Sequence, residues 1–383
     1  MRALLTKQEE ALVDMMTENV FRSKLEDLMP AEELDFPPTP AFGDYRPYLE
    51  HAVSHPAKAN TKLLEFLILR YTKEGDVILD PMSGTGSTGV VAALHGRNAI
   101  LVEIEPRFYE FIVQAKEKVE KVQTLLRKGR ITCILGDARE LSKLLRGIDT
   151  CITSPPYGDT DLSGGDIQRR VERLVRAGYD PREYVHGRAA NAVLRHYGEV
   201  DAVITSPPYT NTANEDIEEV GKYRKGGPFA EEKLGGPAYG DGNISNLPLD
   251  PMDVYLLQGS TGGLEKGDGF DVLYRRLLTK NGRPTYLSEM LLVYREMHKV
   301  LKPGGRAIVI VKPFIKERRV VDLPHITYLL MAKVGFALET LYKLRLKTLS
   351  FWRNLYYQKN PDVPRIMHEY VLVCRKPDAA TGS

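Results

Sequence analysis

The sequence has few of the residues that would place a protein outside the cell or in a membrane. Its 383 residues include three cysteines, and their spacing fits neither a disulfide framework nor a metal site. The longest apolar run, LLEFLILRY at 63–71, is too short to span a bilayer. Lysine and glutamate near the N-terminus interrupt the apolar stretch that a signal peptide needs. We therefore expect a cytoplasmic protein without membrane contact.

Excess charge of one sign is also missing. The net charge is +2, which is too mild to indicate a nucleic-acid partner by itself, so any basic footprint must be local. Glutamine is rare while lysine, arginine and glutamate are abundant, a composition typical of thermophilic proteins. The histidines show no ligand spacing, so we expect no metal. At 43% hydrophobic and 27% charged residues, the chain is a globular one.

From residue 56 onward, helical and strand-like patterns alternate. Apolar periodicity predicts helices at 56–72, 87–96 and 107–129, and strands at 75–80, 98–106 and 130–138. Such alternation predicts an α/β fold with a mostly parallel sheet and helices on both faces.

The C-terminal part predicts helices at 286–300 and 321–334, and a strand after the Pro-Gly-Gly turn at 303–305. Two further strands, 337–348 and 368–376, follow with no helix expected between them, which predicts an antiparallel edge strand.

We expect three regions along the chain. Residues 1–50 are predicted to form an N-terminal helical arm and linker. Residues 51–376 form the main domain, with inserts at about 158–200 and 210–282, and residues 377–383 form a tail. The first insert is helical and rich in arginine, and the second is rich in glycine.

Three successive strands are each expected to end in an acid. Asp80 opens the loop DPMSGTG, Glu103 ends the next strand and Asp137 the third. Glycines in the loop let the backbone approach a ligand, and Glu103 lies where a carboxylate can accept both hydroxyls of a ribose. Asp137 is placed to accept a hydrogen bond from an adenine amino group. The loop also fits the spacing of a dinucleotide-binding motif, so this end alone leaves a dehydrogenase open.

The tetrapeptide Ser-Pro-Pro-Tyr occurs twice, each time after a strand-like run. The copies belong to an internal repeat, in which residues 136–160 align with 187–212. The first copy has Asp137 after its opening glycine, whereas the second has Arg188. The copies are Ser154, Pro155, Pro156 and Tyr157, and Ser206, Pro207, Pro208 and Tyr209.

In combination, DPMSGTG, GDA and TSPPY, with HPAKANTKLLEFLI before them and VLKPGG after, resemble the amino-methyltransferases of the DNA methylase N-4/N-6 class. The resemblance covers most of residues 55–376. It implies a Rossmann-like class I methyltransferase fold and S-adenosyl-L-methionine as cofactor. It assigns the cofactor site to Asp80, Pro81, Met82, Gly84, Gly86, Glu103, Asp137 and Ala138. Met82 departs from the aromatic residue that is usual there.

The tetrapeptide suits methyl transfer to an exocyclic amine. A serine hydroxyl and a proline carbonyl can accept the two N–H bonds of the amine and aim its lone pair at the methyl donor, while the tyrosine stacks on the extruded base. Methylation at carbon 5 needs a cysteine after a proline, which the chain lacks. We expect the first copy to be catalytic, because it follows Asp137 at the spacing of successive strands. The second is either a duplicate kept for packing or a second wall of the cleft.

Aromatic and basic residues alternate at 342–359, a mixture that suits base stacking and phosphate contact but also suits an edge hairpin with a solvated face. The candidate nucleic-acid contacts there are Trp352, Arg353, Tyr356 and Tyr357.

The absence of a visible reader domain favours RNA over DNA. The chain also resembles archaeal proteins of this class that form N4-methylated or N4,N4-dimethylated cytidine in small-subunit ribosomal RNA. The leading hypothesis is therefore a cytidine N4-methyltransferase acting on ribosomal RNA. Its rivals are a DNA N4-cytosine or N6-adenine methyltransferase and a non-catalytic RNA-binding module. A dehydrogenase ranks behind these, since Ser-Pro-Pro-Tyr has no role in one.

Overall fold

The structure is a computed structural model of the chain. It describes residues 19–36, 42–50, 60–123, 127–145, 202–205, 244, 247, 249, 269–316, 318–347 and 351–378; the side chains of 202–205, 351 and 352 are not described.

The first half of the fold alternates strands and helices as the periodicity predicts. Strand β2 is buried along its whole length, as expected for a strand covered on both faces. Asn60 caps the helix before it by accepting hydrogen bonds from the N–H groups of Lys62 and Leu63. The elements are α3 (Thr61–Tyr71), β2 (Val77–Asp80), α4 (Ser87–Leu94), β3 (Asn98–Glu103), α5 (Pro106–Glu120), β4 (Ile131–Leu135), η3 (Ala138–Glu140) and α6 (Leu141–Leu144).

The second half supplies the rest of the sheet. Its elements are β5 (Ala202–Thr205), α12 (Phe270–Arg276), α13 (Tyr286–Val300), β6 (Arg306–Val311), β7 (Phe314–Lys316), β8 (Arg319–Val321), α14 (Leu323–Lys333), β9 (Ala337–Arg345), α15 (Phe351–Lys359) and β10 (His368–Arg375). Strands β7 and β8 pair as a small separate hairpin. Helix α15 lies in the chain between β9 and β10, where no helix was predicted, yet the two strands still pair antiparallel.

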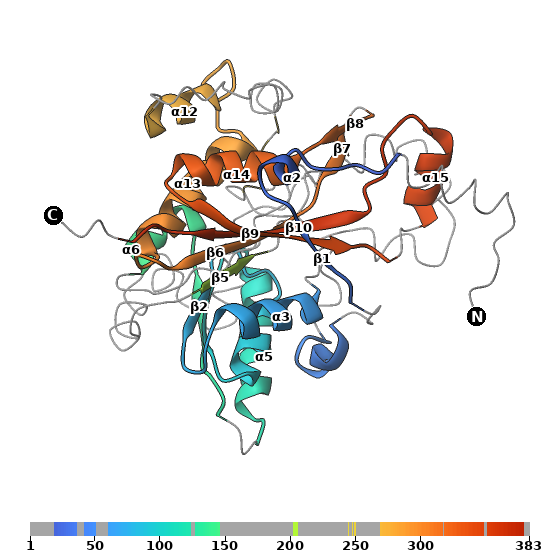
Figure 1. Cartoon of the computed structure of the whole chain (residues 1–383). Coiled ribbons are helices and arrows are strands. Elements are labelled where there is room, and N and C mark those ends of the chain that lie inside the picture. The colour runs from blue at the N-terminus through green and yellow to red at the C-terminus, as the bar shows by residue number, and fades with distance from the viewer. Residues whose placement is uncertain are drawn as a thin grey trace, which may run out of the picture.

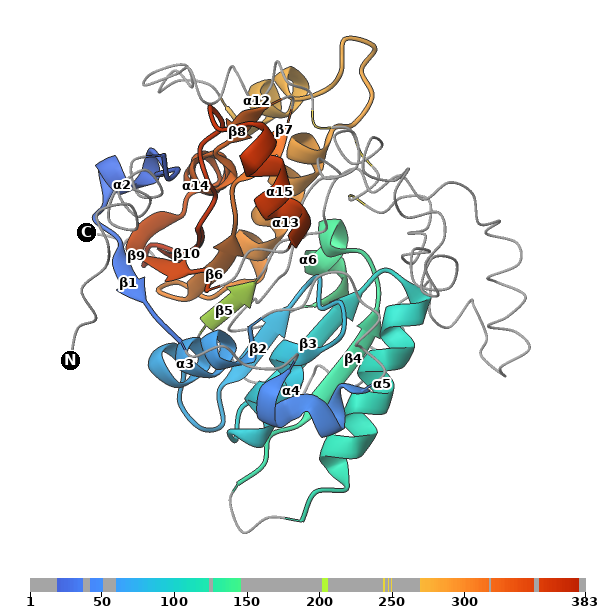
Figure 2. The ribbon, with the colours of Figure 1, turned by 90° about the vertical axis from the view of Figure 1, so that its right-hand side faces the viewer.

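The main sheet has eight strands in the order β1-β9-β10-β6-β5-β2-β3-β4. Strand β5 pairs in parallel with β2 on one side and with β6 on the other. Strand β10 runs antiparallel to both its neighbours, and β9 and β1 continue the sheet beyond it. Helices α3 and α5 cover one face, and α13 and α14 cover the other, as Figure 1 shows and the turned view of Figure 2 confirms. The predicted Rossmann-like fold is confirmed.

The N-terminal region differs from the helical arm predicted for residues 1–50. Within its described part, α2 (Leu25–Leu28) is a single helical turn, and β1 (Glu32–Leu34) pairs in parallel with β9 at the edge of the main sheet. A short helix, η1 (Gly43–Tyr48), follows and buries Tyr45. The acidic pattern of β1 does not favour a strand, so pairing with β9 overrides the local preference.

Asp322 attaches this region to the second half of the fold. The carboxylate is 3% exposed and accepts hydrogen bonds from the Ser23 hydroxyl at 2.7 Å and the Lys24 N–H at 2.8 Å. It also caps α14 by accepting from the His325 N–H. One side chain therefore fixes both the N-terminal segment and the start of a core helix.

We expect Asp322→Ala to lower the free energy of unfolding by about 2–4 kcal/mol, because it removes a helix cap and leaves buried donors without an acceptor. Urea unfolding monitored by circular dichroism measures the change. Asp27→Ala is the control, because Asp27 pairs with Arg22 at the surface and its loss should cost less than about 0.5 kcal/mol. Equal losses in the two variants would contradict the role of Asp322.

Candidate active site

The glycine-rich loop after β2 folds as a tight turn into α4. Gly84 has φ 52° and Gly86 has φ 78°, conformations that favour glycine. Gly86 is the N-cap of α4, and Ser87 is its first helical residue. Further along, a Cβ atom on Gly89 would lie 2.5 Å from Cδ1 of Leu101, so a glycine there lets α4 pack closely on β3.

The loop is held against the end of β3. The N–H of Ser83 donates to the carbonyl of Val102 at 3.1 Å, and its hydroxyl donates to the same oxygen at 3.0 Å. The N–H of Gly84 donates to Oε2 of Glu103 at 2.7 Å. The loop and the strand-end acid predicted from sequence therefore form one unit.

Glu103 is 6% exposed, and its other oxygen accepts a hydrogen bond from the N–H of Glu105 at 2.9 Å. Burial raises the pKa of this carboxyl to about 8, although the two backbone N–H groups favour the charged form. Each carboxylate oxygen has lone pairs left after these bonds. These free acceptor positions therefore fit a ribose whose two hydroxyls both donate to Glu103.

Asp80 is 1% exposed and turns its carboxylate back toward the loop, where Oδ1 accepts from the Met82 N–H at 3.3 Å. Pro81 is buried, and Met82 is half-buried and packs against the core. These residues shape the start of the loop.

Asp137 has more partners than the sequence indicated. It ends the segment after β4, and its Oδ1 accepts from the backbone N–H of Arg139 at 2.8 Å, with buried Ala138 between them. The guanidinium of Arg139 also binds both carboxylate oxygens, with Nε at 3.0 Å from each. An adenine amino group would share this carboxylate with Arg139.

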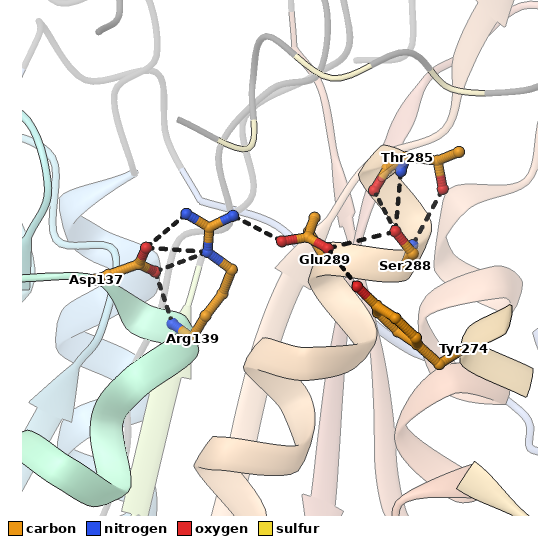
Figure 3. A network of polar contacts seen from close by, with 6 residues as sticks. All are labelled: Asp137, Arg139, Tyr274, Thr285, Ser288 and Glu289. Atoms are coloured by element: carbon orange, nitrogen blue, oxygen red, sulfur yellow. Dashed lines mark hydrogen bonds and ion pairs between the residues drawn. The ribbon is translucent and has the colours of Figure 1, made fainter. Parts of the chain in front are cut away.

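Arg139 extends this pair into a network that reaches the second half of the fold (Figure 3). Its Nη1 lies 2.6 Å from Oε2 of Glu289, whose side chain is 5% exposed. The hydroxyl of Tyr274 donates to Oε1 of the same carboxylate at 3.2 Å. Thr285 and Ser288 form a capping box that begins α13 beside Glu289. Sequence reasoning missed Arg139 and Glu289, whose only local signals are a cation two residues after Asp137 and an acid after a capping box.

The two Ser-Pro-Pro-Tyr segments, 154–157 and 206–209, lie outside the described residues. The strand that leads into the second segment is described: β5 ends at Thr205, directly before Ser206, and fills the place between β2 and β6. We expected the first copy to be catalytic because it follows Asp137 at the spacing of successive strands. In the described sheet, the strand beside β2 is the one that precedes the second copy, residues 202–205.

Lys312, which the sequence did not single out, follows β6 at the same edge of the sheet. Its Nζ lies 3.9 Å from the Glu369 carboxylate, and its side chain is 14% exposed. Burial lowers the pKa of this lysine to about 8, and the charge of Glu369 offsets part of that effect.

Of the aromatic and basic segment 342–359, residues 342–345 end β9, and residues 351–359, which include the four candidate contacts, form the helix α15. Tyr357 is 3% exposed, and its hydroxyl oxygen accepts a hydrogen bond from the N–H of Ile366. Its ring is therefore packed inside the protein and does not offer a face to a base, contrary to our expectation. Arg353 and Tyr356 are half-buried, and the ring of Tyr356 packs edge-on against Tyr357. Trp352 lies in the first turn of the helix.

In the part of the chain that the structure describes, no group of three or more histidine, cysteine, aspartate or glutamate side chains could hold a metal ion. None of its helices combines the length and apolar character needed to cross a membrane.

Residues 18–117 match a family model described as DNA methylase. This match covers the glycine-rich loop and Glu103. It confirms the resemblance to the N-4/N-6 DNA methylase class that the motifs predicted, together with the cofactor of that class, S-adenosyl-L-methionine.

Curated relatives include type II methyltransferases and tRNA dimethyltransferases. The type II methyltransferase M2.DpnII of Streptococcus pneumoniae is 45% identical over 69 residues, 18% of this chain and 25% of the relative. The tRNA (guanine(10)-N2)-dimethyltransferase of Methanothermobacter thermautotrophicus is 30% identical over 169 residues, 43% of this chain and 46% of the relative. The chain therefore spans less than half the length of either relative.

Among solved structures, TrmN from Thermus thermophilus is 12% identical, with a TM-score of 0.39 over 87% of this chain and 52% of that one.

The raised pKa of Glu103 predicts pH-dependent binding of the ribose. Two hydroxyls donate well only to the carboxylate, so below pH 8 binding must first release a proton. The affinity for 5′-methylthioadenosine should then fall by up to about tenfold per pH unit below about 8. This probe has a ribose and adenine but no amino-acid group that titrates near Glu103. Isothermal titration calorimetry between about pH 6 and about pH 9 measures the slope. Glu103→Gln should bind weakly with no such slope, and equal slopes in both proteins would exclude Glu103 as the titrating group.

Proposed function

We propose that this chain, whose residues 18–117 match the DNA methylase family, is an S-adenosylmethionine-dependent methyltransferase of exocyclic amines in nucleic-acid bases. The observation that carries the proposal is the junction of the glycine-rich loop and Glu103, with Gly84 N–H bonded to the buried carboxylate. Bound S-adenosylmethionine supplies an electrophilic methyl group on a sulfonium. Glu103 would hold its ribose, and Asp137 would accept from its adenine amino group.

The second Ser-Pro-Pro-Tyr copy is the proposed catalytic one. Strands β2 and β5 are parallel neighbours, so their carboxyl ends meet at one edge of the sheet. The loop that begins at Asp80 and the segment that begins at Ser206 leave these two ends. The Ser206 hydroxyl and the Pro207 carbonyl would accept the N–H bonds of the target amine, and Tyr209 would stack on the base.

The proposed target is the N4 amine of cytidine in RNA, with small-subunit ribosomal RNA as the substrate. Two observations favour RNA. The matches to tRNA dimethyltransferases extend over 35% and 43% of this chain, against 18% for M2.DpnII. The described residues also form one sheet with its helices and a small hairpin, without a separate reader domain among them. The family model, which is described as DNA methylase, keeps a DNA N4-cytosine or N6-adenine methyltransferase as the second candidate.

The choice between the copies has a direct test. Ser206→Ala with Tyr209→Ala should lower kcat for methyl transfer by about 100-fold or more, because it removes an acceptor of the amine and the stacking ring. Cofactor affinity should stay unchanged. The matched control, Ser154→Ala with Tyr157→Ala, should keep kcat within about threefold of the wild type. Loss of transfer in the control variant alone would return the catalytic role to the first copy.

The substrate is tested with a radiolabelled methyl donor and three acceptors: deproteinised small-subunit RNA, total tRNA and genomic DNA. Label should enter ribosomal RNA and, after digestion to nucleosides, appear as N4-methylcytidine or N4,N4-dimethylcytidine by mass spectrometry. Label in DNA alone would support the second candidate. Label in N2-methylguanosine of tRNA would show that the target is guanosine and not cytidine.

A further inference from the structure

A cluster of exposed cations lies on α12 and the turn that follows it. Arg275, Lys280 and Arg283 are all exposed, and Arg276 beside them is exposed as well. We call Arg275, Lys280 and Arg283 the α12 cation cluster. Residues 272–288 contain no aspartate or glutamate, so this stretch of sequence has only positive charge. Both views place α12 at the upper boundary of the molecule (Figures 1 and 2).

The backbone that presents the cluster is well anchored. Leu273 and Leu277 are 2% and 3% exposed and fix α12 to the core. The turn from Thr279 to Arg283 is closed by a hydrogen bond from the Thr279 N–H to the Arg283 carbonyl at 2.9 Å. The hydroxyl of Thr285 then donates to the Leu277 carbonyl at 2.6 Å, which joins the start of α13 to the end of α12. Cations held on a fixed backbone lose less conformational entropy when they bind a ligand.

A chain of side-chain contacts connects the helix that holds the cluster with the candidate active site. Tyr274, the residue before Arg275, donates to Glu289, and Glu289 pairs with Arg139, which binds Asp137 at the end of β4 (Figure 3). Consecutive helical residues point in different directions. Tyr274 therefore faces this network while Arg275 faces solvent.

Glu289 does not neutralise the cluster. It is the nearest acid after residue 288 in the chain, but it is buried and its carboxylate binds Arg139. Asp271 precedes the cluster, and Nε of Arg275 donates a hydrogen bond to the backbone carbonyl of Asp271 at 3.2 Å. The result is a fixed positive surface whose spread over a helix and a turn suits several phosphates of one strand.

We infer that the α12 cation cluster binds the phosphate backbone of the nucleic-acid substrate beside the target nucleotide. The inference rests on the proposed function and adds the surface that holds the strand. Phosphate contacts of this kind fix register and contribute affinity without reading sequence. Such contacts make binding depend on salt, because each one releases a counterion.

The test compares two triple variants by fluorescence anisotropy with a fluorescein-labelled oligocytidine RNA. The first changes Arg275, Lys280 and Arg283 to glutamine. The control changes Arg70, Lys73 and Arg130, three exposed cations near the amino-terminal ends of β2 and β4, to glutamine. Both variants lose three positive charges, so net charge alone cannot separate them. Thermal unfolding and binding of S-adenosylhomocysteine check that both remain folded.

We expect the cluster variant to weaken RNA binding by about tenfold or more, and to reduce the slope of log affinity against log salt by about 2 for three contacts on a single strand. The control variant should bind within about twofold of the wild type. If RNA binding is unchanged in the cluster variant, or weakened equally in both variants, the proposed role of the cluster is wrong while the proposed function stands. A wild-type protein that binds and methylates no nucleic acid overturns the proposed function, and the cluster with it.

Discussion

The pairing of β5 with β2 and β6 is the contact on which the described sheet depends. On one side lie β2, β3 and β4, which present the glycine-rich loop, Glu103 and Asp137; on the other lie β6, β10, β9 and β1. Register pairs Ile78 with Ala202, and Ala202 with Arg306, so β5 aligns the two groups of strands. Because β5 is parallel to both neighbours, the segment after Thr205 leaves at the edge where the candidate cofactor site lies. The four residues that join the sheet therefore also determine the edge of the sheet at which the chain leaves β5.

A second connection between the halves is made by charge. Arg139 follows β4, whereas Glu289 belongs to the helix that precedes β6, and the two are joined at 2.6 Å. The N–H of Ser142 adds a hydrogen bond to Oε2 of Glu296, which lies further along the same helix, α13. Loss of one partner from a buried ion pair costs about 3–5 kcal/mol, because it leaves an uncompensated charge. Through this network, the position of the Asp137 carboxylate depends on the placement of α13. Helix α13 in turn supports α12 through the bond between Glu289 and Tyr274.

The sequence predicted most of the first half of the fold, because each element there has its own signal. Strand β2 is a short apolar run before a glycine loop, and α5 has a regular apolar stripe, so local periodicity was enough. It failed where pairing decides the structure. Strand β1 has the sequence Glu-Glu-Leu and is a strand because it pairs with β9. Helix α15 has an aromatic, basic sequence that suggests an exposed surface, yet its Tyr357 is buried. The strand next to β2 could not be chosen either, because two copies of one motif have nearly the same local pattern and differ in their partners.

That repeat can now be interpreted as a division of roles. In the first copy, Gly136 is followed by Asp137, Ala138 and Arg139, and this turn supplies the carboxylate and guanidinium beside the cofactor site. In the second copy, the aligned Gly187 is followed by Arg188, Ala189 and Ala190, so this copy has no acid at the position of Asp137 and no guanidinium at the position of Arg139. The second copy instead supplies β5, the strand that occupies the centre of the sheet. A central parallel strand has one place between β2 and β6, so only one copy can supply the strand beside β2. The proposed enzyme thus takes its adenine-binding turn from one copy and its amine-activating loop from the other.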